Sequence, residues 1–400
     1  MAEPPPVMAI CGGGNGAHAL AVVASAHHNG DIVWLTSTPT KADGLREGVF
    51  SPEGLRASGV LRGSASRVRT VSSDPAEVIP AADIVLFVLP AFAHSIALAR
   101  IRPHLKDTVL LGVIPSRGGF EFEVMRTGLL RDGQRRTVFG FQTLPWLCRV
   151  HEWARVVEIK GVKAKIPAAA LPRGRTDEIA RRMTDLVGTA ITSLPNFLHL
   201  TLGNPSQIIH AGIMYAMFRG PALTYRAQEI PRIYDQVDET AARLLEAMSE
   251  DIVAVARAIE EATGGALDMS GVIPIYQWMT QSYPTQVEDK GTLASCFRTN
   301  QAYRGVTAPM REVGPGEYTI DFTHRFLSED VPFGLVVTKA IAEIVDISTP
   351  TLDEVIAWAQ EKLGKQYLIG ARLIGSEVPE LRIPQNNGIR TPKDLIRVYI

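Results

Sequence analysis

Residues 7–20 read VMAICGGGNGAHAL, and this stretch decides the fold of the N-terminal half. The apolar run Val7–Cys11 stops at three glycines, and a helical pattern begins directly after them. Gly12, Gly14 and Ala17 occupy the first, third and sixth positions of the dinucleotide fingerprint G-x-G-x-x-G/A. The first glycine permits a tight turn, and the second lets the backbone approach a pyrophosphate. The small sixth residue lets the helix pack closely against the sheet.

The surrounding pattern completes a strand–helix–strand unit. The helical pattern continues through Ala21–His28 and ends at Asn29–Gly30, a sequence typical of a helix C-terminus. A second strand is predicted over Asp31–Thr36, so the whole has the length of roughly 30 residues that the fingerprint requires. A glycine turn with a purely structural role is the alternative, but the complete unit favours a nucleotide-binding domain.

The end of the second predicted strand lacks the acidic residue that usually binds the ribose of NAD. Residues 35–38 read LTST instead, with Lys41 nearby, and these side chains could hold either a ribose hydroxyl or the extra phosphate of NADP. From the residues alone, NAD and NADP therefore remain equally open. We expect cofactor contacts from Gly12, Gly14, Asn15, Gly16, Ala17, Thr36 and Pro90.

Length and composition limit the class of protein. Four hundred residues predict about two domains, and 46% hydrophobic with 21% charged residues is typical of a globular protein. A net charge of −1 argues against general binding to nucleic acid or to membrane surfaces, because there is no basic excess to meet phosphates.

Cysteine usage and the apolar segments predict a cytoplasmic protein. Cys11, Cys148 and Cys296 are few and far apart, so they form neither a disulfide framework nor a metal-binding spacing. Residues 1–6 lack the basic and apolar regions of a secretion signal. The most apolar stretch, 84–101, is interrupted by Pro90, His94 and Arg100, and we expect no membrane span.

Further strands and loops follow in the N-terminal half. Continuous apolar runs predict buried parallel strands over 82–90, 108–115 and 136–141. The loops after them are candidate site loops, because open α/β sheets bind ligands at the carboxyl ends of their strands. A hairpin of 156–159 with 163–166 and a helix over about 175–187 are also predicted.

From about residue 200 the strand–helix alternation stops. Apolar residues close to a 3.6-residue period predict a long helix over 233–263, and two more helices are predicted over 332–345 and 352–363. The predicted fold class is α/β. We expect an N-terminal Rossmann dinucleotide-binding domain over 1–200 and a mainly α-helical domain over 201–400.

Several segments along the chain together suggest a family. They are CGGGNGAH (11–18), VLPAFAH (88–94), GFEF (119–122), TLPW (143–146), YQW (276–278), RFLSED (325–330) and WAQEK (358–362). With these segments the chain resembles, from end to end, the invertebrate opine dehydrogenases of the octopine dehydrogenase family. Such enzymes reductively condense an α-keto acid, usually pyruvate, with an amino compound, using NADH. The resemblance thus implies NAD as cofactor, pyruvate and a small amino acid as partners, and a monomer or small homo-oligomer.

The resemblance also implies roles for three residues of the C-terminal half. His210 lies among apolar neighbours and by itself would be read as a core histidine, but it matches the family's catalytic histidine, which polarises the keto-acid carbonyl and shuttles protons. Asp330 could cap a helix that begins near Pro332, and it matches the carboxylate that orients His210. Arg325 matches the two-pronged donor for the keto-acid carboxylate.

Other positions bear on the substrates. Thr143 is a candidate hydrogen-bond donor to the keto acid. Arg117 stands where relatives often have a neutral amide, and Gln142 stands where arginine-using relatives place a carboxylate. The loss of that carboxylate disfavours a basic amino substrate. Arg117 either attracts a second anionic group or points to solvent or to a cofactor phosphate, and Trp278 either walls the amino-substrate pocket or belongs to the core.

The expected function is that of an opine dehydrogenase, with taurine as the first candidate substrate, followed by β-alanine, alanine and glycine. Its implied use is regeneration of NAD in anaerobic glycolysis. One alternative is an octopine dehydrogenase that uses arginine. Another is a dehydrogenase of the glycerol-3-phosphate or hydroxyacid type, although those use a lysine where this chain has His210. The third alternative is a regulatory module that senses a nucleotide but catalyses no reaction.

Overall fold

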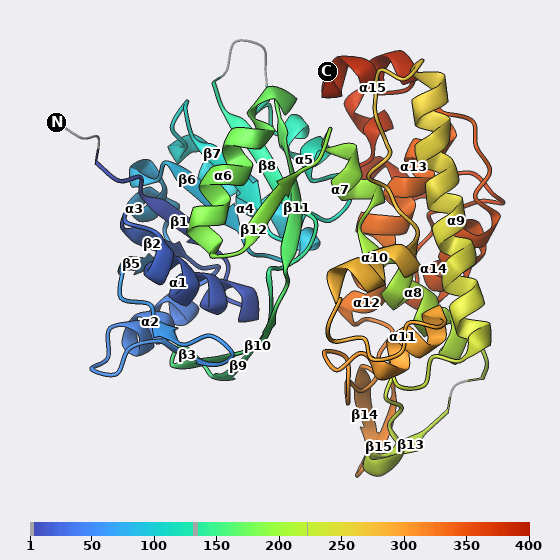
Figure 1. Cartoon of the computed structure of the whole chain (residues 1–400), viewed down its shortest axis with the longest axis horizontal. Coiled ribbons are helices and arrows are strands. Elements are labelled where there is room, and N and C mark those ends of the chain that lie inside the picture. Colours follow the sequence, from blue (N-terminus) through green and yellow to red (C-terminus); the bar gives the residue numbers. More distant parts are fainter. Residues whose placement is uncertain (1–3, 131–134, 222) are drawn as a thin grey trace. The chain divides into compact units, whose positions relative to one another are not determined.

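The computed structural model describes residues 4–130, 135–221 and 223–400. Residues 1–3 lie outside this range. They form part of the segment in which the sequence predicts no secretion signal. The chain forms two compact units (Figure 1). Unit 1 holds the residues up to Ser116, Phe120–Leu200 and Tyr399, and unit 2 holds Arg117–Gly119, Thr201–Val398 and Ile400. No helix within the described residues is long and apolar enough to cross a membrane.

Unit 1 is organised around an eight-stranded sheet with the order β12-β11-β8-β7-β6-β1-β2-β5. Its strands are β1 (Met8–Cys11), β2 (Ile32–Leu35), β5 (Val68–Ser72), β6 (Ile84–Phe87), β7 (Leu110–Val113), β8 (Thr137–Phe141), β11 (Lys165–Leu171) and β12 (Ala190–Ser193). All neighbours pair in parallel except β11 with β8. The apolar runs that predict strands around β1, β2, β6, β7 and β8 therefore all lie in one sheet, as expected for strands buried on both faces.

The register brings the ends of the central strands together. Cys11, the last residue of β1, lies opposite Leu35 of β2 and Phe87 of β6. The residues that follow these three positions therefore meet at the carboxyl edge of the sheet, where ligands of open α/β sheets bind.

Helices connect the strands of unit 1 (Figure 1). They are α1 (Asn15–His27), α2 (Pro39–Val49), α3 (Pro75–Val78), α4 (His94–Ile101), α5 (Phe120–Arg126) and α6 (Thr176–Val187), with α7 (Leu198–Leu202) at the end of the unit. The predicted helices at α1 and α6 are confirmed. Helix α1 is rich in alanine and is buried along residues 16–25, so small side chains let it pack closely against its surroundings.

A second, four-stranded sheet was not predicted. It consists of β4 (Gly63–Ser64), β3 (Arg56–Gly59), β10 (Val156–Val162) and β9 (Trp146–Glu152), in this order. The predicted hairpin of 156–159 with 163–166 is wrong, because β10 pairs with β9 while β11 joins the main sheet beside β8. The run Ala168–Leu171 is buried throughout, as expected of a strand inside a large sheet rather than one arm of a surface hairpin.

Unit 2 is mainly helical, which confirms the predicted fold class. Its helices are α8 (Pro205–Phe218), α9 (Glu239–Ala262), α10 (Ile275–Ser282), α11 (Leu293–Thr299), α12 (Arg325–Ser328), α13 (Val336–Ile344), α14 (Pro350–Leu363) and α15 (Pro392–Tyr399). A three-stranded sheet, β13 (Tyr225–Arg226), β15 (Glu317–Ile320) and β14 (Met310–Gly314), lies at one end of this unit (Figure 1).

Two helix boundaries in unit 2 differ from the prediction. The long helix α9 begins at Glu239 rather than at 233, because the Asp238 side chain caps it by accepting from Ala241 N at 2.7 Å. The helix predicted from 332 begins at Val336 and is preceded by a π-helical turn, Val331–Leu335. Such turns widen the backbone locally and are frequent at functional sites.

Candidate functional site

The glycine turn after β1 requires its first glycine for steric reasons. Gly12 has φ = +146°, and a Cβ atom placed on it would lie 2.3 Å from the carbonyl oxygen of Val88. Its own backbone N–H donates to Leu35 O at 3.0 Å, and its carbonyl accepts from Trp34 Nε1 at 2.6 Å. The turn is thus held between β2 and β6, and a side chain at this position has no room.

The N-terminal end of α1 is open to an anion. Gly14 is the N-cap residue, the helix has no side-chain cap there, and its first turn carries no acidic residue. A Cβ on Gly14 would meet nothing within 4 Å, whereas one on Gly16 would lie 2.8 Å from Leu144 Cδ2. Ala17 is fully buried. Free N–H groups and the helix dipole favour a phosphate at such an end.

Side chains that the sequence did not identify hold this turn. His18 Nδ1 lies 3.0 Å from Gly14 O, and His18 Nε2 accepts from Ala154 N at 3.3 Å. The ring packs between Trp34 and Trp153, with centroid separations of 5.3 and 4.9 Å. Burial lowers the pKa of His18, so the neutral ring donates from Nδ1 to the carbonyl of the turn.

The remaining expected cofactor residues lie at the same edge of the sheet. Thr36 follows β2 and is buried, and its Oγ1 has no hydrogen-bond partner among the described residues. Pro90 begins the loop after β6. Asn15 also contributes to the structure, because its Oδ1 accepts from Val150 N at 2.9 Å. The open glycine turn and the orphaned buried hydroxyl fit a dinucleotide whose pyrophosphate lies on α1.

The glycines of this turn allow binding and folding to be tested separately. We expect Gly14→Ala to leave the free energy of unfolding nearly unchanged, because its methyl group would enter open space at φ = −91°. It should nevertheless weaken NADH binding at least about tenfold, since the backbone can no longer approach the pyrophosphate. Gly12→Ala is the matched control for Gly14→Ala. It should lower the free energy of unfolding by at least about 1–3 kcal/mol. Thermal unfolding and NADH fluorescence titration measure the two effects, and unchanged NADH affinity in Gly14→Ala would contradict the assignment.

Residues 117–119 lie in the loop between β7 and α5 but belong to unit 2. The carbonyl of Gly118 accepts from Arg382 Nε at 2.7 Å, and Gly119 N donates to Thr201 Oγ1 at 3.2 Å. The Arg382 guanidinium is buried and lies 4.6 Å from the centre of the Phe333 ring. These contacts hold the segment, and with it Arg117, against the helices of unit 2.

The centre of the candidate site in unit 2 is a histidine–carboxylate pair. His210 lies in α8, which Asn204 caps by accepting from Ser206 N at 3.1 Å. His210 Nδ1 is 2.7 Å from Asp330 Oδ2. The Asp330 side chain is fully buried, and that of His210 is 15% exposed. Asp330 precedes the π-helical turn, yet its carboxylate makes no capping hydrogen bond there.

Arg117 binds the other oxygen of the same carboxylate. Its Nη1 lies 2.8 Å from Asp330 Oδ1, its Nε lies 3.5 Å from Glu329 Oε1, and Nη1 also donates to Asn204 Oδ1 at 3.3 Å. Its side chain is only 4% exposed. Arg117 therefore does not point to solvent, and its charge is compensated by two buried carboxylates.

Arg325 is the accessible cation of this group. Its Nε lies 3.3 Å from Glu329 Oε2, and its side chain is 46% exposed. The next residue, Phe326, stacks on the His210 ring with a centroid separation of 4.0 Å and an interplanar angle of 18°. Glu329 and Phe326 were not identified from the sequence, although both lie within the RFLSED segment.

The electrostatic surroundings determine the charges of the pair. Burial lowers the pKa of His210. The positive charges of Arg117 and Arg325 lower this pKa further, whereas the negative charge of Asp330 raises it. Burial alone would raise the pKa of Asp330, but Arg117, His210 and Arg325 together hold it below its usual value. The resting pair is thus a neutral imidazole and a carboxylate. A carboxylate can only accept, so the ring proton is on Nδ1 and the lone pair is on Nε2.

The other expected substrate residues lie in both units. Gln142 and Thr143 are in the loop after β8 in unit 1. Gln142 is buried, and its backbone N–H donates to Pro167 O at 2.9 Å. Trp278 lies in α10 of unit 2, is buried, and packs edge-on against Tyr283. Within the described residues, no group of three or more His, Cys, Asp or Glu side chains is arranged to hold a metal ion.

Comparisons with known proteins identify the family of the chain. The α-helical domain of NAD/NADP octopine/nopaline dehydrogenases matches residues 193–363. An opine dehydrogenase of Haliotis discus hannai is 34% identical over 97% of this chain and 98% of its own length. A tauropine dehydrogenase of Arabella iricolor is 31% identical over 96% of this chain and 98% of its own length.

Solved structures of an octopine dehydrogenase are similar over 98% of both chains. The structure with NADH and L-arginine has a TM-score of 0.85 at 30% identity, and the structure with NADH and pyruvate has a TM-score of 0.81 at 29% identity. With relatives above 30% identity along nearly its whole length, this chain belongs to the octopine dehydrogenase family of NAD-dependent oxidoreductases acting on CH–NH donors.

Proposed function

We propose that this protein is an opine dehydrogenase that condenses pyruvate with the amino group of a small, non-basic amino acid and reduces the product with NADH. The observation that supports this most directly is the 2.7 Å pair of His210 with Asp330 beside the half-exposed Arg325. The octopine dehydrogenase solved with NADH and pyruvate supports the choice of keto acid. In the cell the reaction would regenerate NAD in oxygen-poor glycolysis.

Arg325 binds the carboxylate of pyruvate in the proposed reaction. A guanidinium offers two parallel N–H donors that match a carboxylate, and partial exposure leaves this one accessible. Thr143 is the second proposed donor to the keto acid. Arg325 Nε also lies 3.3 Å from Glu329 Oε2, but a guanidinium carries five N–H donors, so the half-exposed side chain retains donors for the pyruvate carboxylate.

His210 Nε2 transfers protons in the proposed reaction. As the amino nitrogen attacks the carbonyl carbon, Nε2 accepts a proton from nitrogen and returns it to the carbonyl oxygen, which becomes a hydroxyl. A second proton, taken up from solvent and donated by the imidazolium, lets this hydroxyl leave as water, and the nitrogen lone pair forms the carbon–nitrogen double bond of an iminium. Asp330 stabilises the imidazolium that forms in between and keeps the ring in orientation. Bound NADH supplies the hydride that reduces the resulting carbon–nitrogen double bond.

The proposed amino substrate is neutral or anionic beyond its amino group. Gln142 carries no charge that could meet a guanidinium, which disfavours arginine. Arg117 is compensated by Glu329 and Asp330, so we do not assign it the anionic group of the substrate. Taurine is the first candidate, followed by β-alanine, alanine and glycine.

A substrate panel tests this proposal. With pyruvate present, NADH oxidation is measured with taurine, β-alanine, alanine, glycine or arginine, and with no amine. We expect oxidation to require an amine, to be faster with a small non-basic amino acid than with arginine, and to be slower with NADPH. Equal rates without any amine would indicate a hydroxyacid-type dehydrogenase. NADH binding without oxidation by any pair would indicate a nucleotide-sensing module, and the highest rate with arginine would contradict the proposed substrate class.

A further inference from the structure

Unit 1 contains a cavity of about 760 Å³ at the edge of the sheet opposite to the glycine turn. Asp83 and Ile84 line it where β6 begins, Thr108 and Leu110 line it where β7 begins, and Thr137 lines it at the start of β8. These are the amino ends of parallel strands, whereas Gly12 follows the carboxyl end of β1. The cavity is therefore separate from the proposed cofactor site.

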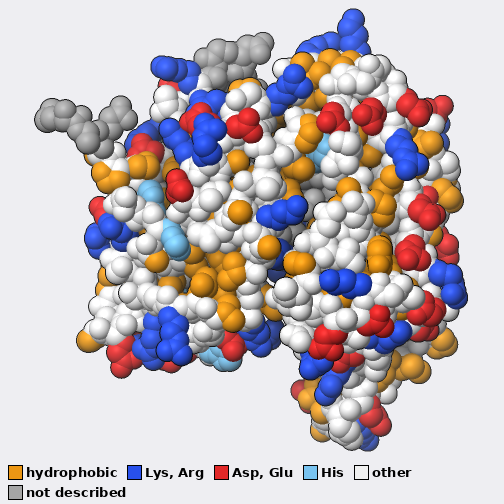
Figure 2. Space-filling model, viewed as in Figure 1, with side chains coloured by type: hydrophobic (Ala, Val, Ile, Leu, Met, Phe, Trp, Pro, Cys, Tyr) orange, Lys and Arg blue, Asp and Glu red, His pale blue; other side chains and the backbone are white. Residues whose placement is uncertain are grey.

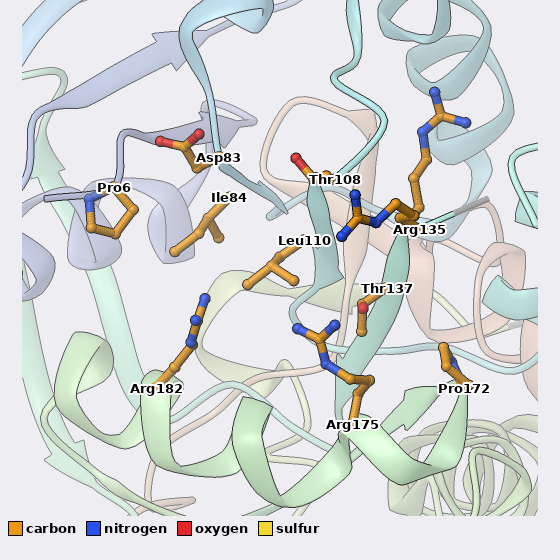
Figure 3. Close-up of a pocket in the computed structure, with 11 residues that line it drawn as sticks. Pro6, Asp83, Ile84, Thr108, Leu110, Arg135, Thr137, Pro172, Arg175 and Arg182 are labelled. Carbon is orange, nitrogen blue, oxygen red and sulfur yellow. The ribbon is translucent and has the colours of Figure 1, made fainter. Parts of the chain in front are cut away.

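Four arginines line this cavity and make it positively charged. Arg135 and Arg136 directly precede β8, Arg175 lies in the turn before α6, and Arg182 lies in α6. Figure 3 shows the side chains of Arg175, in the turn before α6, and of Arg182, in α6, extending toward the strand ends, across from Asp83 and Thr108. The floor between them is apolar at Ile84 and Leu110.

The carboxylates near these arginines do not cancel their charge. Glu178 is shared, since it lies 2.6 Å from Arg175 Nε and 3.2 Å from Arg182 Nη2. Asp107 lies 2.8 Å from Arg136 Nη2, and Asp83 lies 2.7 Å from Lys106 Nζ. Four arginines and one lysine thus face three carboxylates, which leaves two positive charges in excess.

This local excess contrasts with the rest of the molecule. The whole chain has a net charge of −1, and basic and acidic side chains are interspersed over the face drawn in Figure 2. A concentration of arginines in one cavity is therefore not a consequence of a generally basic surface. Cavities of about 300–1,000 Å³ are the size that small ligands occupy, rather than a polymer.

We propose that this cavity binds a small organic dianion with phosphate or carboxylate groups. Arginine forks match both groups in a bidentate manner, the two excess charges match a dianion, and the apolar floor can contact a carbon skeleton. The hydroxyls of Thr108 and Thr137 are additional polar groups of the lining. This site is independent of the proposed dehydrogenase reaction, so either can fail without the other.

Calorimetric titration of the NADH-loaded enzyme tests the proposal, because bound NADH blocks the other phosphate site. The probes are phenyl phosphate for the phosphate source and succinate for the carboxylate source, both organic dianions at neutral pH, with sodium chloride at matched ionic strength as reference. At least one probe should bind. Arg182→Gln should weaken that binding about tenfold, the loss expected for one charged hydrogen bond. Glu178→Gln should strengthen it, because it removes the competing carboxylate.

Two residues of the same helix serve as matched controls. Arg181→Gln and Asp185→Asn change the net charge by the same amounts, but neither residue lines the cavity. They should leave the affinity for the probe nearly unchanged. The proposal is wrong if neither probe binds beyond the chloride reference, or if the control variants shift the affinity as much as Arg182→Gln and Glu178→Gln do.

Discussion

Replacement of His210 by alanine is expected to lower kcat by roughly 10²–10⁴-fold, the contribution of a positioned proton-transfer group. The affinity for NADH should stay nearly unchanged, because the glycine turn and α1 belong to unit 1 and His210 belongs to unit 2. Steady-state NADH oxidation with pyruvate and the best amine of the panel measures the first effect. Fluorescence titration with NADH in the absence of substrates measures the second.

Two controls separate lost chemistry from a damaged fold. His210 stacks on Phe326, so alanine also removes a ring contact, and the unfolding temperature of the variant has to be measured. His151→Ala is the matched histidine control, because that side chain is 57% exposed and pairs with Glu158 on the four-stranded sheet. It should keep the wild-type rate. A folded His210→Ala enzyme that retained most of its kcat would contradict the proton-transfer role.

Much of unit 1 could be predicted because its signals are local. Apolar runs of four to six residues, glycines and helix-ending sequences lie next to one another in the chain, so β1, α1 and β2 follow directly from residues 7–36. Strand pairing is not local. Nothing within 156–166 indicates that β10 pairs with β9 while β11 pairs with β8, and the predicted hairpin was wrong for this reason.

The candidate site in unit 2 could be predicted only in part, for a similar reason. His210, Asp330 and Arg325 became candidates through a resemblance to a family, since each also has an ordinary structural interpretation. The surroundings of Arg117 could not be inferred from its sequence position. Its carboxylate partners Glu329 and Asp330 lie more than 200 positions later in the chain, and only the folded unit brings them within ion-pair distance.

Replacement of Asp330 by asparagine is the second prediction with a large effect. The amide can donate to the ring and select the wrong tautomer of His210, so kcat should fall by roughly 10²–10⁴-fold. The pH dependence of the residual activity should also change. Asp330 raises the pKa of His210, and its loss leaves burial and the two arginines, which lower it. The limb of the pH profile that reports His210 should therefore move to lower pH.

Arg117→Gln should move the same limb in the opposite direction. Arg117 lowers the pKa of His210, so removing its charge raises that pKa and the midpoint moves to higher pH. Arg117→Lys, which keeps the positive charge, should return the midpoint toward the wild-type value. Because the loss of one partner from a buried ion pair costs about 3–5 kcal/mol, activity has to be measured well below the unfolding temperature of each variant. If Asp330→Asn and Arg117→Gln shift the limb in the same direction, or if neither shifts it, these two charges do not set the pKa of His210 as described.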